Sequence, residues 1–533
     1  MDFAPIDRRS ALIGGSALAA SALLPRAAFA QSQPRRGGTL VAQTYSDLRM
    51  LNPAIRTSFA IHVFTSKMVE PLVDLAPNGD AAPRLATSWS WSPDSRTVQF
   101  RLREGVQWHD GKPFTSADVQ YCAMEMWKKY QNFGMQLHKN LVAVDTPDPL
   151  TAVFRYSEPM PQGLLLRALA ELGQVVPKHV YQGTNILDNP ANLQPVGTGP
   201  FKFVAYVPGQ HLIMERNPNY WMTGFPYLDK VIVRVIPDGA ATAAALESGD
   251  ITMSLFSSLP RTEYVRLSKD KRFRVSSKGN EGNPLFNTIG FNTRKKELSD
   301  VRVRRAFAHA IDLEAYAKRF DYGYSQKAQG AWPVGSPFFQ SGVPNYPFDL
   351  KMAEALLDEA GYKRGPDGVR MRLRIMPNSS EGIKQLAVYI QQSMQKVGVR
   401  MENVVLDAPG YNKFVNREWD FDVCTDTGTF RGDPAVGSTL WYRSGIAPGT
   451  PWSNQFGWKN DELDRLSDAA AVETNFDKRR DMYGRIAVIA NTEIPVWMAL
   501  EQRMISAVNA KVRNDHNMPR WPASSWHDTW IDT

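Results

Sequence analysis

Residues 83–121 constrain the fold of this chain more than any other stretch, although they contain no catalytic or metal-binding constellation. Apolar residues alternate with polar ones at Val98, Phe100 and Leu102, which is the period of a strand with one buried face. Thr115 or Ser116 is then a suitable cap for a helix. The apolar face of that predicted helix consists of Val119, Cys122, Met126 and Tyr130. The stretch therefore predicts a hairpin followed by a capped helix.

The same segment resembles the signature of the extracytoplasmic solute-binding proteins of peptide-type ABC importers. In that family L-A-x-S-W is followed by S-x-D-x-x-T-x-x-F and then by L-R-x-G-V-x-W-x-D-G-x-P-F-T-x-x-D-V, and this chain has the same order without a gap. The likeness continues over most of the chain beyond residue 37, in the segments 37–40, 197–201, 217–221, 300–307 and 350–361.

The resemblance implies an α/β protein with the two-lobed periplasmic-binding-protein fold and an extra subdomain on the first lobe. Alternating short strands and helices in both halves also favour two α/β lobes. The predicted ranges are 37–74, 197–285 and 500–533 for the first lobe, 75–196 for the extra subdomain and 286–499 for the second lobe. Two chain crossings would then form the hinge.

Two local patterns make structural predictions inside this frame. Two glycines and a proline in residues 197–201 predict a tight crossing of the backbone; a phosphate loop is excluded because no Lys-Ser or Lys-Thr follows. Asp300 is expected to cap a helix that places Val303, Phe307 and Ile311 on one face. The arginines of this helix are expected on its solvated side.

Residues 1–30 have the features of an export signal. Arg8 and Arg9 precede an apolar stretch from Ala11 to Leu24, and a small-x-small cleavage motif ends at Ala30. As a helix the stretch would be roughly 21 Å long, too short for a hydrocarbon core of about 30 Å. The paired arginines favour the twin-arginine route, with the general secretory route as the alternative. We therefore predict a periplasmic protein cleaved after Ala30.

The net charge and the distribution of apolar residues exclude several classes of protein. The formal charge of +8 is spread along the chain without a run of five like charges, so no nucleic-acid tract is indicated. No other stretch is long and apolar enough for a permease. Cys122 and Cys424 are the only cysteines, and both lie in patterns typical of buried elements. We expect two separate thiols, although a disulfide is common in an oxidising compartment.

No motif for catalysis, a metal or a cofactor is present. The eight histidines lie more than five positions apart, which is unlike the close ligand pairs of zinc sites. Neither G-x-S-x-G, H-E-x-x-H nor a glycine-rich nucleotide loop occurs. His109-Asp110 are expected to have a structural role. We predict a protein that is not an enzyme.

The chain is instead rich in aromatic residues, with 14 Trp, 18 Tyr and 25 Phe. Aromatic faces with a few placed polar groups suit a cleft for a small organic ligand. The predicted rim residues are Tyr45, Trp332, Phe338, Trp419, Phe430, Trp441 and Tyr442. Each of them could equally pack in a core.

The loop within residues 424–442 differs from the resembled family. Its peptide binders carry an acid three positions before the last Asp of G-D-x-x-D-P or a similar motif, and that acid pairs with the α-ammonium of the peptide. Here Asp433 aligns with the last Asp, and Phe430 occupies the place of the acid. Asp426 or Asp433 could take over the role. Otherwise the ligand lacks a free amino terminus, and Arg431 binds a carboxylate or phosphate or forms a salt bridge within the loop.

The function implied is the ligand-capturing subunit of an ABC importer, a monomer that closes over a peptide or peptide-like solute and delivers it to membrane permease subunits. Alternatives are an opine, a glycoside or another modified organic acid as ligand, a chemoreceptor-coupled sensor, or an envelope chaperone. The predicted ligand-binding residues are Tyr45, Asn292, Trp332, Trp419, Asp426, Phe430, Arg431, Asp433 and Trp441.

Overall fold

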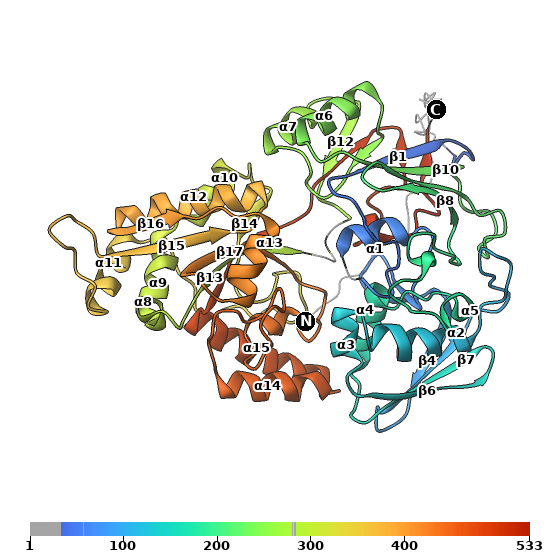
Figure 1. The fold of residues 1–533 in the computed structure, drawn as a ribbon, viewed down its shortest axis with the longest axis horizontal. Helices are drawn as coiled ribbons and strands as arrows, with labels where there is room; N and C mark the ends of the chain where they lie inside the picture. Colours follow the sequence, from blue (N-terminus) through green and yellow to red (C-terminus); the bar gives the residue numbers. More distant parts are fainter. Residues whose placement is uncertain (1–32, 57, 280, 282–283, 533) are drawn as a thin grey trace, which may run out of the picture. The chain divides into compact units, whose positions relative to one another are not determined.

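A computed structural model describes residues 33–56, 58–279, 281 and 284–532 (Figure 1). Met1–Pro34 and Arg35–Thr533 separate into two units, and the architecture below belongs to the second. The predicted export signal and its cleavage site lie outside the described residues. Among the described residues, no helix is long and apolar enough to cross a membrane.

The first lobe is built on a seven-stranded sheet assembled from the beginning, the middle and the end of the chain. Its strands, in spatial order, are β12 (Phe273–Ser276), β19 (Ser506–Asn509), β11 (Met253–Ser254), β1 (Thr39–Thr44), β10 (Lys230–Val235), β9 (His211–Arg216) and β8 (Phe201–Val207). The central strand β1 is parallel to β10 and β11, whereas the remaining pairs are antiparallel. Helices of this lobe are α1 (Phe59–Thr65), α6 (Gly239–Ser248) and α7 (Arg261–Leu267).

The second lobe is built on a six-stranded sheet. Its strands, in spatial order, are β14 (Ser325–Lys327), β18 (Val496–Gln502), β13 (Leu285–Phe291), β17 (Val423–Thr429), β15 (Met371–Pro377) and β16 (Val399–Asn403). β15 is parallel to both β16 and β17. The helices are α8 (Lys296–Ser299), α9 (Val301–Ala310), α10 (Leu313–Arg319), α11 (Leu350–Glu359), α12 (Glu381–Lys396), α13 (Ala408–Tyr411), α14 (Asp461–Val472) and α15 (Phe476–Glu493).

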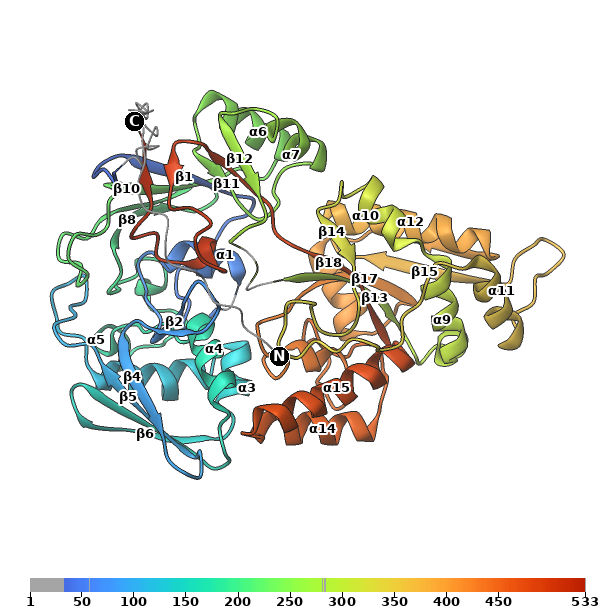
Figure 2. The same cartoon turned by 180° about the vertical axis from the view of Figure 1, so that it is seen from behind.

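Both faces of this second sheet are buried. Along β17, Val423 packs into one apolar cluster and Cys424 into the other, and Ile375 and Met376 of β15 divide in the same way. Successive side chains of a strand point to opposite faces, so the two clusters lie on opposite sides of the sheet. Figures 1 and 2 show α12 and α15 on these two sides. The continuous apolar character of the strands follows from this double covering.

The extra subdomain contains a four-stranded antiparallel sheet. Its order is β4 (Ala86–Trp91), β5 (Thr97–Leu102), β7 (Thr151–Tyr156) and β6 (Leu141–Asp148), and its helices are α2 (Ser116–Tyr121), α3 (Asn132–Leu137), α4 (Gln162–Leu172) and α5 (Lys178–Tyr181). The predicted hairpin and capped helix are confirmed, because Thr115 and Asp118 form a capping box. The helix itself ends at Tyr121 and continues as a π-helical turn, η1 (Cys122–Trp127).

The chain passes between the first and second sheets twice. One passage lies between β12 and β13, and the other between β18 and β19. β18 belongs to the second sheet as far as Gln502, whereas the sequence placed the boundary at 499/500. The domain ranges given above remain predictions. Short ladders complete the fold: β2 (Val73–Leu75) with β3 (Ala81–Pro83), and β20 (Val512–Arg513) with β21 (Trp530–Ile531).

The motifs that carried the resemblance converge on one buried carboxylate, Glu70. It accepts hydrogen bonds from Arg84, Thr198, Tyr220 and Trp221, at distances of 2.8 to 2.9 Å. These donors come from three of the resembled segments, which are far apart in the sequence. Because a buried carboxylate needs several donors to offset its lost hydration, the four residues hold the first lobe and the extra subdomain together. The motifs are therefore structural.

The predicted backbone crossing at residues 197–201 is also confirmed. A Cβ atom on Gly197 would lie 1.9 Å from the carbonyl oxygen of Met68, and one on Gly199 would lie 2.5 Å from that of Lys67. The Gly199 amide donates to the Met68 carbonyl at 2.9 Å. Only glycine permits such a close approach of two chain segments.

The prediction of a solvated arginine face on α9 is wrong for Arg304. Its side chain is buried, and its guanidinium donates to the carbonyl oxygens of Glu493 and Leu298 at 2.7 Å. Arg305 donates likewise to Thr492 at 2.8 Å. The last carbonyls of α15 have no partner within their own helix, and the two arginines of α9 supply donors to them. Asp300 caps α9 as expected.

Candidate functional site

The carboxyl ends of the parallel strands are where open α/β sheets place their ligands. In the first lobe β1 ends just before Tyr45, and in the second lobe β15 and β17 end just before Asn378 and Phe430. These strand ends are therefore the starting point for a candidate solute site.

Asp426 is a buried carboxylate in the middle of β17, beside the carboxyl end of β15, with 6% of its surface exposed. It accepts hydrogen bonds from the Asn378 side chain at 2.6 Å and from the Thr427 amide at 2.7 Å. No basic side chain among the described residues forms an ion pair with it, and burial raises its pKa to about 6. A carboxylate in this setting gains most from a cationic partner, because burial penalises its charged form.

Asp433 lies in the loop that follows β17 and has such a partner. Its two oxygens accept hydrogen bonds from the Arg479 guanidinium at 2.5 and 2.7 Å, and both side chains are almost fully buried. Arg479 also donates to the carbonyl of Ala470 at 2.8 Å. This bidentate pair ties the loop to α15 within the second lobe. Its carboxylate is fully engaged, which leaves no open position for a ligand ammonium.

Arg431 forms a salt bridge, but with Glu171 of α4 in the extra subdomain and not within its own loop. Its guanidinium also lies 4.1 Å from the centre of the Phe133 ring. Nearby, Val436 belongs to the apolar core of the first lobe and the extra subdomain. The loop of residues 430–437 therefore bridges the second lobe to the rest of the molecule.

Three aromatic residues of the predicted site are buried in the second lobe. Trp332 donates its indole N–H to the Tyr483 carbonyl at 3.0 Å and packs 6.4 Å from the Phe430 ring. Trp441 stacks on Phe456 at 6.3 Å and covers Gly428, where a Cβ atom would meet its ring at 2.8 Å. All of these rings belong to the core cluster on the α15 side of the sheet. Their contacts fix the loop and its neighbours.

Tyr45 differs from them because 49% of its surface is exposed. Its ring meets Phe256 edge-on at 5.8 Å, and Phe256 also contacts Phe59 and Phe64. Phe256 has a backbone φ of 64°, a strained conformation for an aromatic residue. The first lobe thus presents a supported aromatic surface at the end of β1.

Asn292 and Trp419 are not close to this loop. The Asn292 side chain donates to the carbonyls of Trp419 and Phe421 at 2.9 and 2.8 Å, just before β17 begins. Phe430 follows the other end of that seven-residue strand, about 20 Å away at 3.3 Å per residue. Among the predicted residues of the second lobe, Asn292 and Trp419 therefore lie at the start of β17, Asp426 in its middle, and Phe430, Arg431 and Asp433 beyond its end.

The sequence motifs did not predict several residues that lie in this region. They are Glu171, Phe133, Asn378, His62 and Arg520. Glu171 could have been noticed as a single acid on the buried face of the leucine-rich helix α4. The others become visible only once distant segments meet.

The structure assigns packing roles to His109 and the cysteines. His109 contacts the Gly199 carbonyl at 3.0 Å and accepts from the Gly197 amide at 3.2 Å, which braces the backbone crossing. Cys122 and Cys424 are separate buried thiols, as expected. Among the described residues, no group of three or more His, Cys, Asp or Glu side chains could hold a metal ion.

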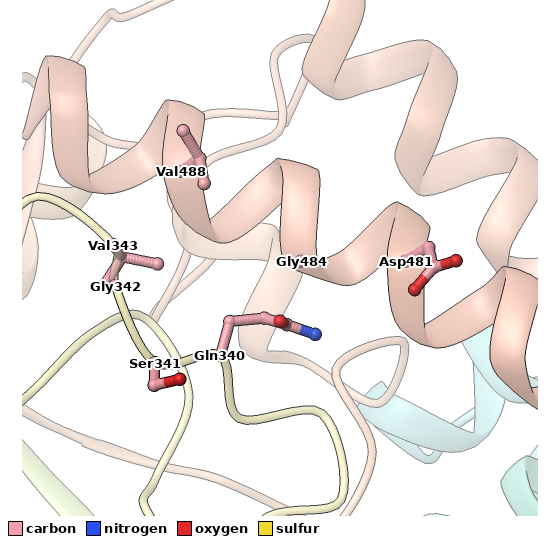
Figure 3. Close-up of a pocket in the computed structure, with 7 residues that line it drawn as sticks. All are labelled: Gln340, Ser341, Gly342, Val343, Asp481, Gly484 and Val488. Carbon is pink, nitrogen blue, oxygen red and sulfur yellow. The ribbon is translucent and has the colours of Figure 1, made fainter.

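Two pockets lie away from the strand ends. One, of about 200 Å³, is formed by residues 340–343 and the exposed side of α15, where Gly484 leaves room beside Gln340 (Figure 3). The other, of about 20 Å³, lies beside Arg520 and Ala170 and has room for about one water molecule. Neither is lined by Tyr45, Asp426 or the loop of residues 430–437.

Comparison with known proteins connects these features to a family. The model of the bacterial extracellular solute-binding proteins, family 5, matches residues 80–448. A relative from Brucella ovis, whose name places it among ABC transporter peptide-binding proteins, is 31% identical over 429 residues, 78% of each chain. The dipeptide-binding protein of Escherichia coli is 24% identical over 81% of this chain and 83% of its own.

Solved structures show the same fold. The DppA protein of Helicobacter pylori, solved with the peptide STSA, has a TM-score of 0.80 and 25% identity, and the match covers 94% of this chain and 99% of that one. AgaA of Agrobacterium tumefaciens, solved with agropinic acid, has a TM-score of 0.77 and 24% identity over 93% and 99%. The predicted two-lobed α/β fold is confirmed.

Proposed function

Since the chain belongs to the bacterial extracellular solute-binding proteins of family 5, we propose that it binds a peptide or peptide-like small organic solute between its lobes and delivers it to an ABC permease. Solute binding for ABC transport is the role of this family. The Brucella ovis, Escherichia coli and Helicobacter pylori proteins are named for or solved with peptides, which supports the ligand class.

The observation that carries this proposal is the buried Asp426. It lies in the middle of β17 beside the carboxyl end of β15, where its hydrogen bonds with Asn378 and Thr427 fix its orientation. An ammonium group of the solute would supply the missing cation, in a charge-assisted contact of about 1.5 to 3 kcal/mol. We assign Asp426 the role that the resemblance gave to an acid at position 430.

Tyr45 would contribute the opposing wall. Its half-exposed ring stands on Phe256, and aromatic faces hold the apolar parts of small organic ligands. Contacts from both lobes exist only in the closed form, so the solute shifts the population toward closure by that difference in affinity. Phe430 and Arg431 would act by holding the loop, and Asp433 by fixing it to α15.

The protein acts as a monomeric binding subunit without catalytic activity, is exported to the periplasm and is cleaved after Ala30. The family supports the role of a carrier. The Arg8-Arg9 pair supports the twin-arginine route.

A second ligand class is favoured by Phe430, which removes the acid typical of the resembled peptide binders. AgaA, solved with agropinic acid, shows the same fold around a non-peptide solute. An opine or another modified organic acid that carries an amine would use the same Asp426 contact.

Native mass spectrometry of protein purified from the periplasm should identify a retained solute, and di- to hexapeptides should raise Tm because a ligand of the native state stabilises it. Asp426→Asn should abolish both effects. An exposed-site variant, Asp270→Asn, should retain them, because Asp270 pairs only with its neighbour Arg272 on the surface. Equal affinity of Asp426→Asn and wild-type protein for the retained solute would refute the assignment of Asp426.

A further inference from the structure

The segment that follows β11 contains two consecutive residues in a strained backbone conformation. Phe256 and Ser257 have φ values of 64° and 55°. Among the described residues they are the only two neighbours without glycine in which both φ values are positive. Side chains other than glycine adopt this left-handed region unwillingly and stay there only where surrounding contacts hold them. Contacts on both sides must therefore hold this pair in place.

On one side of the pair, Ser257 holds the chain at a hinge crossing. β11 pairs with β19 only as far as Ser254 and Ala507. Beyond this point the Ser257 amide donates to the carbonyl oxygen of Ile505 at 3.0 Å, and its hydroxyl oxygen accepts from the Ile505 amide at 2.8 Å. Ile505 is completely buried and lies between β18 of the second sheet and β19 of the first. The serine thus fixes the first-lobe end of this crossing.

The lobes touch beside this point. Tyr264 of α7 donates its hydroxyl to the same Ile505 carbonyl at 3.3 Å, and its ring lies 6.3 Å from that of Tyr324, which precedes β14 in the second lobe. Arg261, also in α7, donates to Asp321 of the second lobe at 3.0 Å. The Ile505 peptide therefore lies at the joint about which the two lobes would move.

On the other side of the pair, Phe256 supports the aromatic surface at the end of β1. Its ring meets Tyr45, Phe59 and Phe64 edge-on, at 5.8, 5.6 and 5.7 Å. This is a preferred geometry for aromatic pairs. Tyr45 is half exposed and Phe64 is fully buried, so the Phe256 ring connects the exposed surface with the core. Because Phe256 and Ser257 share a peptide bond, a change at one of them alters the backbone of the other.

We propose that Phe256 and Ser257 are positioning residues that couple the aromatic surface at Tyr45 to the hinge at Ile505. This inference rests on the proposed solute-binding function. A solute packed on Tyr45 holds the Phe256 ring, which keeps the strained pair in place and Ser257 against Ile505. With fewer ring contacts the pair relaxes, and the Ile505 amide loses its acceptor. Because such coupling is reciprocal, the solute strengthens the Ser257 contact by the factor by which this contact raises solute affinity.

Hydrogen exchange of the Ile505 amide tests the coupling without a solute, in the mature full-length protein. Tyr45→Ala should accelerate this exchange about fivefold, because it removes one of the ring contacts that hold Phe256 while Ser257 is unchanged. Tyr45→Phe keeps the ring and should exchange like the wild type. The amides of β19 are the internal reference, since a general loss of stability would accelerate their exchange as well.

Ser257→Ala should accelerate the exchange of Ile505 about tenfold, because the amide loses its acceptor. Tyr45→Ala added to this variant should cause no further acceleration, since the link is already broken. Two matched controls should leave Ile505 unchanged. Phe476→Ala removes a ring that is 48% exposed, like Tyr45 at 49%, but lies in the second lobe. Ser95→Ala changes a serine with a φ of 56° between β4 and β5 of the extra subdomain.

Phe256→Leu is a second variant in case Ser257→Ala does not fold, and it should accelerate the exchange of Ile505 at least as much as Tyr45→Ala. Equal exchange of Ile505 in the wild type and in Tyr45→Ala would overturn the coupling, even if Ser257→Ala exchanges faster and whether or not a peptide binds.

A solute arm separates the coupling from the proposed function. The peptide Ser-Thr-Ser-Ala should slow the exchange of Ile505 in the wild type but not in Ser257→Ala. If Tyr45→Ala acts as expected and none of the di- to hexapeptides binds, the coupling is supported and the peptide class is refuted. A peptide that binds the wild type without slowing the exchange of Ile505 would overturn the coupling and leave the proposed function intact.

Discussion

Asp426 lies in β17 and Asp433 in the loop that follows this strand; both are almost completely buried, but they differ in their partners. Asp433 receives two hydrogen bonds from Arg479, a cation of the same lobe. Asp426 receives hydrogen bonds from an amide side chain and a backbone N–H, and burial raises its pKa to about 6. The charge of Asp433 is therefore balanced by a cation of the protein, whereas the charge of Asp426 is left for a cationic group of a ligand to balance. The same residue type thus stabilises the loop at one position and binds the solute at the other.

The largest effect is expected where the ion pair is complete. Asp433→Asn should lower the free energy of unfolding by about 3 to 5 kcal/mol, because it leaves the buried Arg479 charge uncompensated. Urea denaturation of the second-lobe transition would measure this loss. Replacing both partners, as in Asp433→Leu with Arg479→Met, should cost clearly less than the single change. A loss below about 1 kcal/mol for Asp433→Asn would remove the contrast between the two carboxylates.

Asp426→Asn should act in the opposite direction on stability. The folded pKa of Asp426 lies above its unfolded value of about 3.9, so folding favours the protonated form and stability is lost as the pH rises from about 4 to about 6. Asparagine keeps the acceptor for Asn378 and Thr427 but carries no charge. The variant should therefore be more stable than the wild type by about 2 to 3 kcal/mol at pH 7.

This gain should vanish below about pH 4, where the wild-type carboxyl is protonated in both states. Parallel urea titrations at pH 4 and pH 7 would show it, with Asp433→Asn as the variant of opposite sign. A destabilised Asp426→Asn at pH 7 would mean that the carboxylate already has a cationic partner in the folded protein. More stability together with weaker solute binding is the pattern expected of a functional residue.

The sequence predicted the secondary-structure elements of this region better than the contacts between its side chains. The strands, the cap at Thr115 and the glycine crossing at residues 197–201 follow from local patterns, which depend on neighbours along the chain. Asp426 and Asp433 were both recognised as candidates. The choice between them depends on Arg479, 46 positions away, and no periodicity reports such a contact.

Local sequence patterns also could not predict the salt-bridge partner of Arg431 or the burial of the aromatic residues. Arg431 was considered for an anion or for a salt bridge within its loop, but its partner Glu171 lies 260 positions earlier. Composition also does not distinguish a rim ring from a core ring. Tyr45 is half exposed, whereas Trp332 and Trp441 are buried, although all three lie in loop-like sequence or short turns. Tertiary packing decides these cases.

The pH dependence of binding sharpens the comparison further. If the ionised Asp426 pairs with an ammonium of the solute, affinity should be constant above about pH 7 and should fall about fivefold between pH 6 and pH 5, since one proton must leave before the solute binds. Isothermal titration with the retained solute would measure this slope, and Asp426→Asn should bind weakly with no such dependence. A flat wild-type profile would mean that Asp426 does not meet a cation.

The smallest effect concerns the far end of the loop, where the second lobe approaches the extra subdomain. Gly437 has a φ of 108°, and a Cβ atom there would lie 2.7 Å from the Phe133 ring. Gly437→Ala should therefore combine backbone strain of about 1 kcal/mol with a steric clash. Only the clash depends on the approach of the loop to Phe133.

Phe133→Ala in the same protein should relieve the clash and leave the strain. If closure, measured by the solute-induced decrease in radius of gyration in solution scattering, is impaired in Gly437→Ala and recovers in the double variant, the loop has two separable roles. Asp433 then ties it within its lobe, and Gly437 permits its approach to the opposite side. An unchanged defect in the double variant would place the whole effect in the backbone of the loop.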